Sequence, residues 1–337
     1  MSIESHKQYR PLAVYTDMDD TDFAAGVSLL EAAGFDVRYA SSQDPAVIAR
    51  EAAKATALLV GYAQIDADLL DKLPDLRIIA LMSVGYNNVD LDEARRRGIW
   101  LTNIPAAATE EVATHALALA LAAVRDLPFF AQAVNNGEWN IRNDRAPLRL
   151  SSRRLGLVGL GRIGRRFGQL ASPTFGEVIG YDPMLPDTPE TEAELKAAGI
   201  RRTGLDEVLE TSHVLSLHVP LTPETDKLMN AGTIARMPAG SFLVNVSRGQ
   251  LIDVEAVVEA LDAGHLAGVA VDVLEQEPPA ADHPLLTHPR ALVTPHVAYF
   301  SDHTDSEYVR QQAQNVASWY ATGTPDTPIF PLQPART

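Results

Sequence analysis

The chain contains no cysteine and no long apolar run, and it has far fewer basic than acidic side chains. Without cysteine it can form no disulfide, no thiolate metal site and no cysteine nucleophile. The longest apolar run, residues 116–124, is far too short to span a bilayer. The N-terminal residues show no apolar core of the kind that signal peptides have. We therefore expect a cytoplasmic protein.

The charge balance argues against binding to polyanions. Lys and Arg total 28 and Asp and Glu total 44, which gives a net charge of −16. Such a chain is a poor general ligand for nucleic acid or for an anionic membrane. Its 337 residues are more than a domain with a single hydrophobic core usually contains, and they fit two domains of about 100–200 residues each.

Strands alternate with helices in the first hundred residues. Apolar stretches at 12–16, 35–40, 57–61 and 77–81 favour strands, and helices are expected near 45–54 and 66–72. This alternation predicts a parallel sheet with helices on both faces. An acidic run follows the first strand and contains Asp17, Asp19, Asp20 and Asp22. Its spacing does not fit a calcium loop, so we interpret it as a solvated helix start and predict no metal.

The turn after the fourth strand has two interpretations. Backbone N–H groups at Ser83, Val84 and Gly85 could face outward and bind an anion, or the segment could be an ordinary strand-to-helix turn. Further on, Thr109 is a plausible N-cap for an apolar helix that reaches about Leu127. A polar stretch at 135–154 then resembles a long arm.

A glycine motif marks the start of a second strand-and-helix series. Gly159, Gly161 and Gly164 form G-x-G-x-x-G at the end of the apolar stretch LGLVGL and before a helix that Pro173 should end early. Asp182 follows the next strand, where its carboxylate could bind the ribose hydroxyls of NAD and repel the 2′-phosphate of NADP. The pattern predicts a dinucleotide site with NAD preferred.

Three polar residues follow later strands of this series. Arg248 comes after LVNVS, Glu277 after GVAVDVLEQ and His296 after ALVTP. Because parallel strands end at one edge of a sheet, these side chains could converge. A histidine can exchange a proton with a carbonyl oxygen, a glutamate can orient the ring, and an arginine suits a carboxylate. Each also has an ordinary structural interpretation, and position alone does not decide between them.

Seven ordered motifs resemble those of the D-isomer-specific 2-hydroxyacid dehydrogenases. They are SVGYNNVD, NIPAAATEEVATHALAL, LGLVGLGRIGRR with YDP, LHVPLTPET, LVNVSRGQLID, GVAVDVLEQEP and VTPHVA. The resemblance implies two doubly wound α/β domains: a flavodoxin-like substrate-binding domain of residues 1–105 and 298–337, and a Rossmann NAD-binding domain of residues 106–297. Within the family, YDPMLPD and PHVAYFSDHTDSEYVRQQAQN look most like the C-terminal-binding-protein branch.

The same resemblance implies roles for particular residues. His296 would be the acid/base, Glu277 its assistant and Arg248 the substrate-binding cation, while the backbone at Val84 and Gly85 would bind the substrate carboxylate. Tyr299 would line the substrate pocket. NAD contacts would also include Thr109, Gly159, Gly161, Arg162, Ile163, Gly164, Asp182, Val219, Pro220, Val246, Ser247, Asp272 and His296.

These residues predict an NAD-dependent oxidoreductase that interconverts a 2-keto acid and a D-2-hydroxy acid, and the resemblance implies a homodimer. Val84, Gly85 and Arg248 would hold the carboxylate while His296 protonates the carbonyl oxygen. The resemblance to corepressors leaves one alternative, an NADH-sensing interaction protein with little turnover. The two differ in whether NADH binding is accompanied by the reduction of any 2-keto acid.

Overall fold

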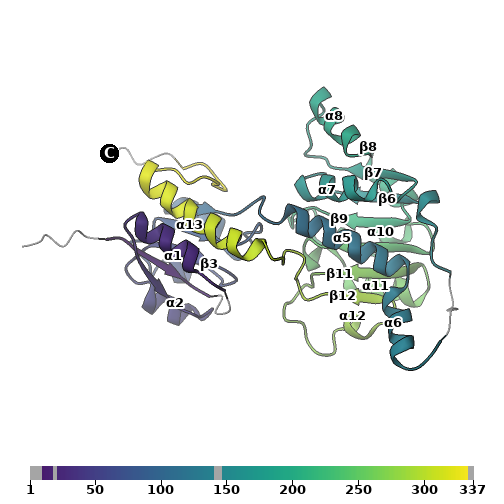
Figure 1. Ribbon diagram of the computed structural model, residues 1–337, viewed down its shortest axis with the longest axis horizontal. Coiled ribbons are helices and arrows are strands. Elements are labelled where there is room, and N and C mark those ends of the chain that lie inside the picture. The colour runs from purple at the N-terminus through teal and green to yellow at the C-terminus, as the bar shows by residue number, and fades with distance from the viewer. Residues whose placement is uncertain (1–9, 18–20, 140–145, 333–337) are drawn as a thin grey trace, which may run out of the picture. The chain divides into compact units, whose positions relative to one another are not determined.

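The chain forms two compact units in the computed structural model, which describes residues 10–17, 21–139 and 146–332 (Figure 1). The first unit takes its described residues from the chain up to Ala107 and from Ser301 onward. The second unit runs from Ala108 to Phe300. The chain therefore leaves the first unit once and returns to it once, close to the two boundaries expected from the sequence.

The first unit is built on a parallel sheet of five strands in the order β2-β1-β3-β4-β5. This is the flavodoxin-like strand order, whose switch point lies between β1 and β3. The strands are β1 (Leu12–Tyr15), β2 (Asp36–Tyr39), β3 (Ala55–Val60), β4 (Ile78–Leu81) and β5 (Trp100–Thr102).

Helices cover both faces of this sheet because successive strand residues point to opposite sides. On one face, Ala13, Leu59 and Ala80 pack with residues of α1 (Ala24–Ala32) and α13 (Thr304–Thr322). On the other face, Leu58 and Leu81 pack with residues from the remaining helices and with Phe330. These helices are α2 (Pro45–Glu51), α3 (Ala67–Leu70) and α4 (Leu91–Arg96).

The second unit is built on a parallel sheet of seven strands in the order β12-β11-β10-β9-β6-β7-β8. The strand order reverses between β6 and β9, as it does in Rossmann folds. The strands are β6 (Arg154–Val158), β7 (Glu177–Tyr181), β8 (Ile200–Arg202), β9 (Val214–Leu217), β10 (Ser241–Asn245), β11 (Leu266–Val271) and β12 (Ala291–Val293). The prediction of two doubly wound parallel-sheet domains is confirmed.

Two hydrophobic clusters cover the two faces of this sheet. One joins α5 (Thr109–Val124) and α7 (Arg162–Ala171) to strand residues such as Leu157 and Val244. The other joins α9 (Leu205–Thr211), α10 (Ala231–Ala235) and α11 (Val254–Asp262) to residues such as Leu217 and Val271. The unit also contains α6 (Leu127–Asn135), α8 (Pro189–Ala197), α12 (Pro284–Thr287) and short 3-10 turns at Leu150–Ser152 and Gly249–Leu251.

Helix ends test several local predictions. Helix α5 begins at Thr109 itself, so its N-cap is Ala108, which makes no side-chain capping bond, and the predicted Thr109 cap is wrong. The carboxylates of Glu110 and Glu111 lie in the first turn, where they interact favourably with the positive end of the helix dipole. Helix α7 ends at Ala171, before Pro173, as predicted.

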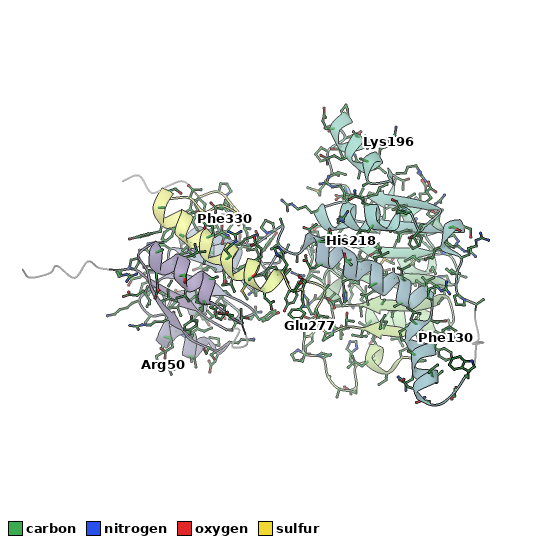
Figure 2. The ribbon with its side chains drawn as sticks, viewed as in Figure 1. Arg50, Phe130, Lys196, His218, Glu277 and Phe330 are labelled. Carbon is green, nitrogen blue, oxygen red and sulfur yellow. The ribbon has the colours of Figure 1, made fainter. Side chains whose placement is uncertain are left out.

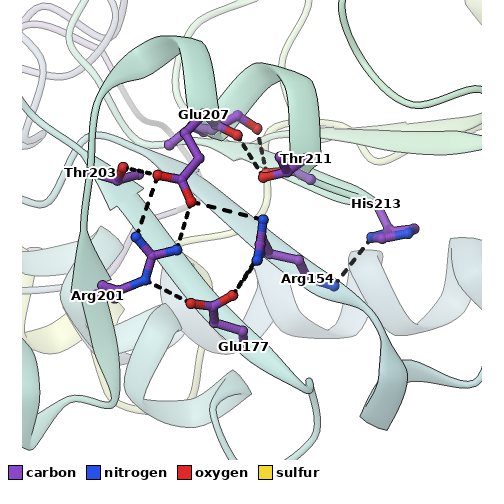
Figure 3. A network of polar contacts seen from close by, with 9 residues as sticks. Arg154, Glu177, Arg201, Thr203, Glu207, Thr211 and His213 are labelled. Atoms are coloured by element: carbon purple, nitrogen blue, oxygen red, sulfur yellow. Dashed lines mark hydrogen bonds and ion pairs between the residues drawn. The ribbon is translucent and has the colours of Figure 1, made fainter.

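An ion-pair network ties together three neighbouring strands and a helix of the second unit (Figure 3). Glu177 on β7 accepts hydrogen bonds from Arg154 on β6 and Arg201 on β8, both at 2.7 Å. Arg201 also contacts Glu207 on α9 at 2.7 Å, and Thr203 donates to the same carboxylate. The network links β6, β7 and β8 to α9 through side chains that are not among the predicted site residues.

The acidic run after β1 contributes one buried structural group. The Asp17 carboxylate accepts hydrogen bonds from the backbone N–H groups of Gly61, Tyr62 and Ala63, which links the loop after β1 to the loop after β3. Asp19 and Asp20 lie outside the described residues. No single helix among the described residues has the length and apolar composition needed to cross a membrane.

Candidate active site

The glycine motif forms the turn between β6 and α7, at the carboxyl end of the strand. Gly159 has a φ of +99°, and a Cβ there would lie 2.4 Å from the carbonyl oxygen of His218. A Cβ on Gly164 would lie 2.1 Å from the carbonyl oxygen of Gly159. The packing of the protein itself therefore requires glycine at both positions.

Gly161 differs from the other two glycines. It occupies the N-cap of α7 with a φ of −67°, and a Cβ built on it meets no described heavy atom within 4 Å. Nothing in the packing explains the missing side chain, whereas the close approach of a ligand would. The first N–H groups of a helix attract phosphate. This open N-terminus therefore fits the pyrophosphate of a dinucleotide.

Asp182 lies directly after β7 and holds the glycine turn in place. One carboxylate oxygen accepts from the N–H of Leu160 at 2.9 Å, and the other accepts from the N–H of Met184 at 2.9 Å. Each oxygen retains a second lone pair that can accept a hydroxyl hydrogen. Asp182 can therefore serve both the turn and a ribose.

His218, which is labelled in Figure 2, packs against the glycine turn, since a Cβ on Gly164 would lie 3.3 Å from the Cβ of His218. Its Nε2 lies 2.9 Å from the hydroxyl oxygen of Ser216, and its ring lies 5.2 Å from that of Phe167. Burial lowers the pKa of His218 to about 3, so the ring is neutral at pH 7. The sequence indicated no role for His218, which packs beneath the motif as an uncharged support.

His296 and Glu277 form a hydrogen-bonded pair. The Nδ1 of His296 lies 2.6 Å from Oε2 of Glu277, and both side chains are more than a third exposed. Because an ionised carboxylate only accepts, Nδ1 carries the hydrogen and the ring orientation is set. Among the described residues, none forms a hydrogen bond with Nε2 of His296. That nitrogen is therefore available to a substrate.

Glu277 is anchored at its other oxygen. The N–H of Leu274 donates to Oε1 at 2.8 Å. Partial burial acts to raise the pKa of Glu277, but the hydrogen bonds from His296 and Leu274, with the charges of His296 and Arg248, outweigh it and lower the pKa. The carboxylate therefore stays ionised at neutral pH and can stabilise a protonated imidazole.

Arg248 lies close enough to Glu277 for their charges to interact. It follows β10 by three residues, and its Nη1 donates to the carbonyl oxygen of Ser247 at 2.6 Å. Burial lowers the pKa of Arg248 and the charge of Glu277 opposes that change, so the guanidinium remains a cation. A Cβ on the adjacent Gly249 would lie 1.9 Å from the carbonyl carbon of Leu274, so the segments carrying Arg248 and Glu277 are in direct backbone contact.

Most of the other predicted coenzyme residues lie along the same edge of the sheet. Because the strands are parallel, their carboxyl ends share one edge. The relevant positions are Arg162 and Ile163 at the start of α7, Val219 and Pro220 after β9, Val246 and Ser247 after β10, and Asp272 after β11. Thr109 is the first residue of α5, and the half-buried Tyr299 follows His296 by three positions.

Val84 and Gly85 belong to the first unit, where their carbonyl groups are tied back to the protein. The carbonyl oxygen of Val84 accepts from the side-chain amide of Asn103 at 2.7 Å, and that of Gly85 accepts from the Ser83 hydroxyl at 2.6 Å. The carbonyl oxygen of Ser83 itself accepts from the N–H of Ile104. Within the described residues, the N–H groups of Val84 and Gly85 find no acceptor. Fixed carbonyls and unused N–H groups suit an anion, and the sequence did not single out Asn103.

A second histidine–glutamate pair shows that such a hydrogen bond alone does not identify a candidate acid/base. The Nε2 of His283 lies 3.1 Å from Glu275, but its Nδ1 accepts from the N–H of Leu285. Both nitrogens are engaged, so His283 caps α12 and has no free position for a substrate. His296 differs because its Nε2 is available.

Comparisons with known proteins agree with this architecture. Residues 117–298 match the family model described as D-isomer specific 2-hydroxyacid dehydrogenase, NAD binding domain. The chain is 37% identical over 270 residues to a D-3-phosphoglycerate dehydrogenase of Bacillus subtilis (strain 168), covering 80% of this chain and 50% of that protein. It therefore spans about half the length of that relative.

Two further relatives are matched over more of their length. A glyoxylate reductase of Korarchaeum cryptofilum is 37% identical over 260 residues, covering 76% of each chain. A crystal structure of an NADPH-dependent glyoxylate/hydroxypyruvate reductase from Sinorhizobium meliloti, in complex with NADP and malonate, superposes with a TM-score of 0.83 at 30% identity. It covers 95% of this chain and 97% of that one. The chain belongs to the D-isomer specific 2-hydroxyacid dehydrogenase family, and its second unit carries the NAD-binding domain of that family.

Proposed function

We propose that this protein is an NAD-dependent oxidoreductase that interconverts a 2-keto acid and a D-2-hydroxy acid. One observation carries the proposal: Glu277 orients the His296 ring so that its Nε2 stays available, and the charge of the same glutamate interacts with that of Arg248. The pair lies at the edge of the sheet that also carries the glycine turn. Bound NAD would supply or accept the hydride.

The proton is the part of the reaction that these side chains provide. During reduction, the Nε2–H of protonated His296 would donate to the carbonyl oxygen of the 2-keto acid. Glu277 would hold Nδ1–H and stabilise the imidazolium before the transfer. During oxidation, neutral His296 would take the hydroxyl proton at Nε2. One histidine thus serves both directions.

The substrate carboxylate needs hydrogen-bond donors that carry positive charge. The guanidinium of Arg248 presents a planar pair of N–H groups that matches a carboxylate. The N–H groups of Val84 and Gly85 face no described acceptor. We propose that both bind the substrate, with Arg248 also polarising the carbonyl.

The coenzyme preference that we propose is NAD over NADP. The carboxylate of Asp182 would accept from the ribose hydroxyls and repel a 2′-phosphate. The Sinorhizobium meliloti relative is NADPH-dependent by its name, so membership in the family does not decide the question. Comparing kcat/KM for NADH and NADPH tests it, and a higher value with NADPH would contradict it.

We propose an unphosphorylated substrate with an apolar or aromatic side chain. No basic residue lies between Ile79 and Asp90, and Tyr299 could line the pocket with its ring. A panel of 2-keto acids tests this choice: glyoxylate, pyruvate, hydroxypyruvate, phenylpyruvate, 4-methylthio-2-oxobutyrate and phosphonopyruvate. The highest kcat/KM is expected for phenylpyruvate or 4-methylthio-2-oxobutyrate.

The homodimer, the cytoplasmic location and the C-terminal-binding-protein-like branch stay predictions. An NADH sensor would need a coenzyme site but no oriented acid/base, and the named relatives above are all enzymes. NADH binding without turnover of any 2-keto acid would favour the sensor.

A further inference from the structure

We infer that His115 is a positioning residue for His296, acting through Thr294 and Asp272. His115 lies on α5, whereas Thr294 follows β12 and Asp272 follows β11. The Nε2 of His115 is 3.0 Å from the hydroxyl oxygen of Thr294 and 3.5 Å from Oδ1 of Asp272. The inference rests on the proposed acid/base role of His296.

The hydrogens in this cluster can be placed from its geometry. Thr294 has one hydroxyl hydrogen, and its oxygen lies 2.5 Å from Oδ1 of Asp272. An ionised carboxylate only accepts, so Thr294 donates to Asp272. Toward His115 the Thr294 oxygen can then only accept, which places a hydrogen on Nε2 of His115. That N–H also points positive charge toward Asp272.

Asp272 in turn fixes the backbone around His296. Its carboxylate accepts from the N–H of Val297 at 3.0 Å and of Ala298 at 2.8 Å. The N–H of His296 donates to the carbonyl oxygen of Asp272 at 2.8 Å. A single residue, only 1% exposed, therefore holds three consecutive positions of the segment that carries the acid/base.

The backbone of His296 needs this support because its conformation is unfavourable. His296 has a φ of +54°, in the left-handed region that residues with a Cβ rarely occupy. Such a conformation persists where surrounding bonds determine it. Removing the N–H of His115 would break the hydrogen bond that links the Thr294–Asp272 pair to α5. The backbone at His296 would then be less fixed, and so would the orientation of its ring.

A purely structural role for His115 makes a different prediction. As a space-filling core residue it would affect the thermal midpoint alone. As a positioning residue it affects the environment of the His296 ring and the rate of the proton-transfer step. The two roles can therefore be separated by experiment.

The experiment compares His115→Leu, His115→Gln and Thr294→Val in the full chain. Gln is expected to restore a donor near the position of Nε2, and Val is isosteric with Thr but has no hydroxyl. The first readout is the NMR spectrum of the His296 ring in protein without coenzyme or substrate, assigned by the loss of its signals in His296→Asn. The second readout is kcat and KM for the 2-keto acid, with the Kd of NADH.

We expect His115→Leu and Thr294→Val to shift the His296 signals and to lower kcat about tenfold. His115→Gln should keep kcat within about threefold of the wild type. His265→Gln is the matched control, since His265 is half-buried in the same unit and bonds to the carbonyl oxygen of Ile234. It should leave both readouts unchanged.

Unshifted His296 signals in both His115→Leu and Thr294→Val would overturn the inference, even if the thermal midpoint fell. Should His115→Leu fail to fold, Thr294→Val decides the question. If the wild type reduced no 2-keto acid, the proposed function would fail, whereas the coenzyme-free spectra would still decide whether His115 positions His296.

Discussion

Single residues in the glycine turn have different reasons for being glycine. Gly159 and Gly164 have no room for a Cβ, because each would meet a backbone oxygen. Gly161 has open space at that position and an ordinary φ. Its missing side chain therefore serves something other than the fold.

This difference predicts separate effects on stability and binding. Gly161→Ala should leave the thermal midpoint unchanged or slightly higher, since Ala restricts the unfolded chain without straining the folded one. It should weaken NADH binding about tenfold or more, because the methyl group occupies the approach of the pyrophosphate. Calorimetry and NADH fluorescence titration measure the two effects. Gly164→Ala is the matched variant and should lower the thermal midpoint strongly; equal NADH affinity in Gly161→Ala and the wild type would contradict the account.

Arg248 should affect the substrate rather than the coenzyme. Arg248→Ala removes the cation for the carboxylate, so KM for the 2-keto acid should rise about a hundredfold while the Kd of NADH stays nearly constant. Arg248→Lys keeps the charge but not the planar pair of N–H groups, so its KM should lie between those of the wild type and Arg248→Ala. Steady-state kinetics with varied 2-keto acid gives the answer. An unchanged KM in Arg248→Ala would remove Arg248 from the proposed site.

The sequence could identify the type of residue at the site but not its contacts. Strand ends placed Arg248, Glu277 and His296 at one edge, and the motifs of the family supplied their roles. The free Nε2 of His296 depends on side-chain positions that no spacing encodes. Nothing in the sequence indicates a role for His115, because its partners Thr294 and Asp272 lie far along the chain.

At the scale of elements, the apolar stretches predicted β1 to β4 of the first sheet, whereas the three-residue strand β5 was not predicted although it is buried. The three-residue edge strand β8 carries two arginines, so its pattern shows no apolar alternation. Helix α6 was also not predicted, and it begins after Asp126, which has a φ of +51°. The Thr109 cap was wrong by one position because helix ends depend on the tertiary path of the chain.

The ion-pair network on β7, β8 and α9 predicts a pH-dependent stability. Hydrogen bonds from Arg201 and Thr203 lower the pKa of Glu207 to about 2. Because the folded value lies below the unfolded one, the stabilisation is complete above pH ~4.5 and is lost as the pH falls toward 2. Glu207→Gln should therefore lower Tm by about 1–3 °C at neutral pH, and the difference should shrink with acidification.

Calorimetry at several pH values between neutral and about pH 3 measures this difference. The control is Glu259→Gln, which changes an exposed glutamate of α11. Its effect on Tm should be small at every pH. A Glu207→Gln difference that stayed constant or grew in acid would contradict the assigned sign.

At the scale of the whole molecule, family membership follows from the fold and from the matched sequences, but the substrate does not. Several relatives with different names share the architecture, and a difference of one methylene group changes binding by only about 1–3 kcal/mol. The sequence could therefore predict two doubly wound units and a dinucleotide site, whereas the identity of the 2-keto acid depends on the detailed shape of the pocket.

The surface of the second unit predicts its assembly. Leu127, Phe129 and Val134 on α6 are each 46–55% exposed, and Trp139 beyond it is 89% exposed. Exposed apolar groups of this number suit a contact with another protein surface. We expect the wild type to be a dimer by light scattering and Phe129→Ser with Trp139→Ser to shift it toward the monomer. Phe300→Ser, at another exposed apolar residue, is the control. A monomeric wild type would contradict the prediction.

The central claim is that His296 transfers a proton during NADH-dependent reduction of a 2-keto acid. The most direct measurement compares the wild type with His296→Asn, following NADH oxidation with the best acid of the panel and titrating NADH binding in parallel. The account predicts ready turnover by the wild type and a loss of about a hundredfold or more in kcat for the variant, with NADH affinity retained. Equal turnover by the two proteins, or NADH binding without turnover by the wild type, would contradict it.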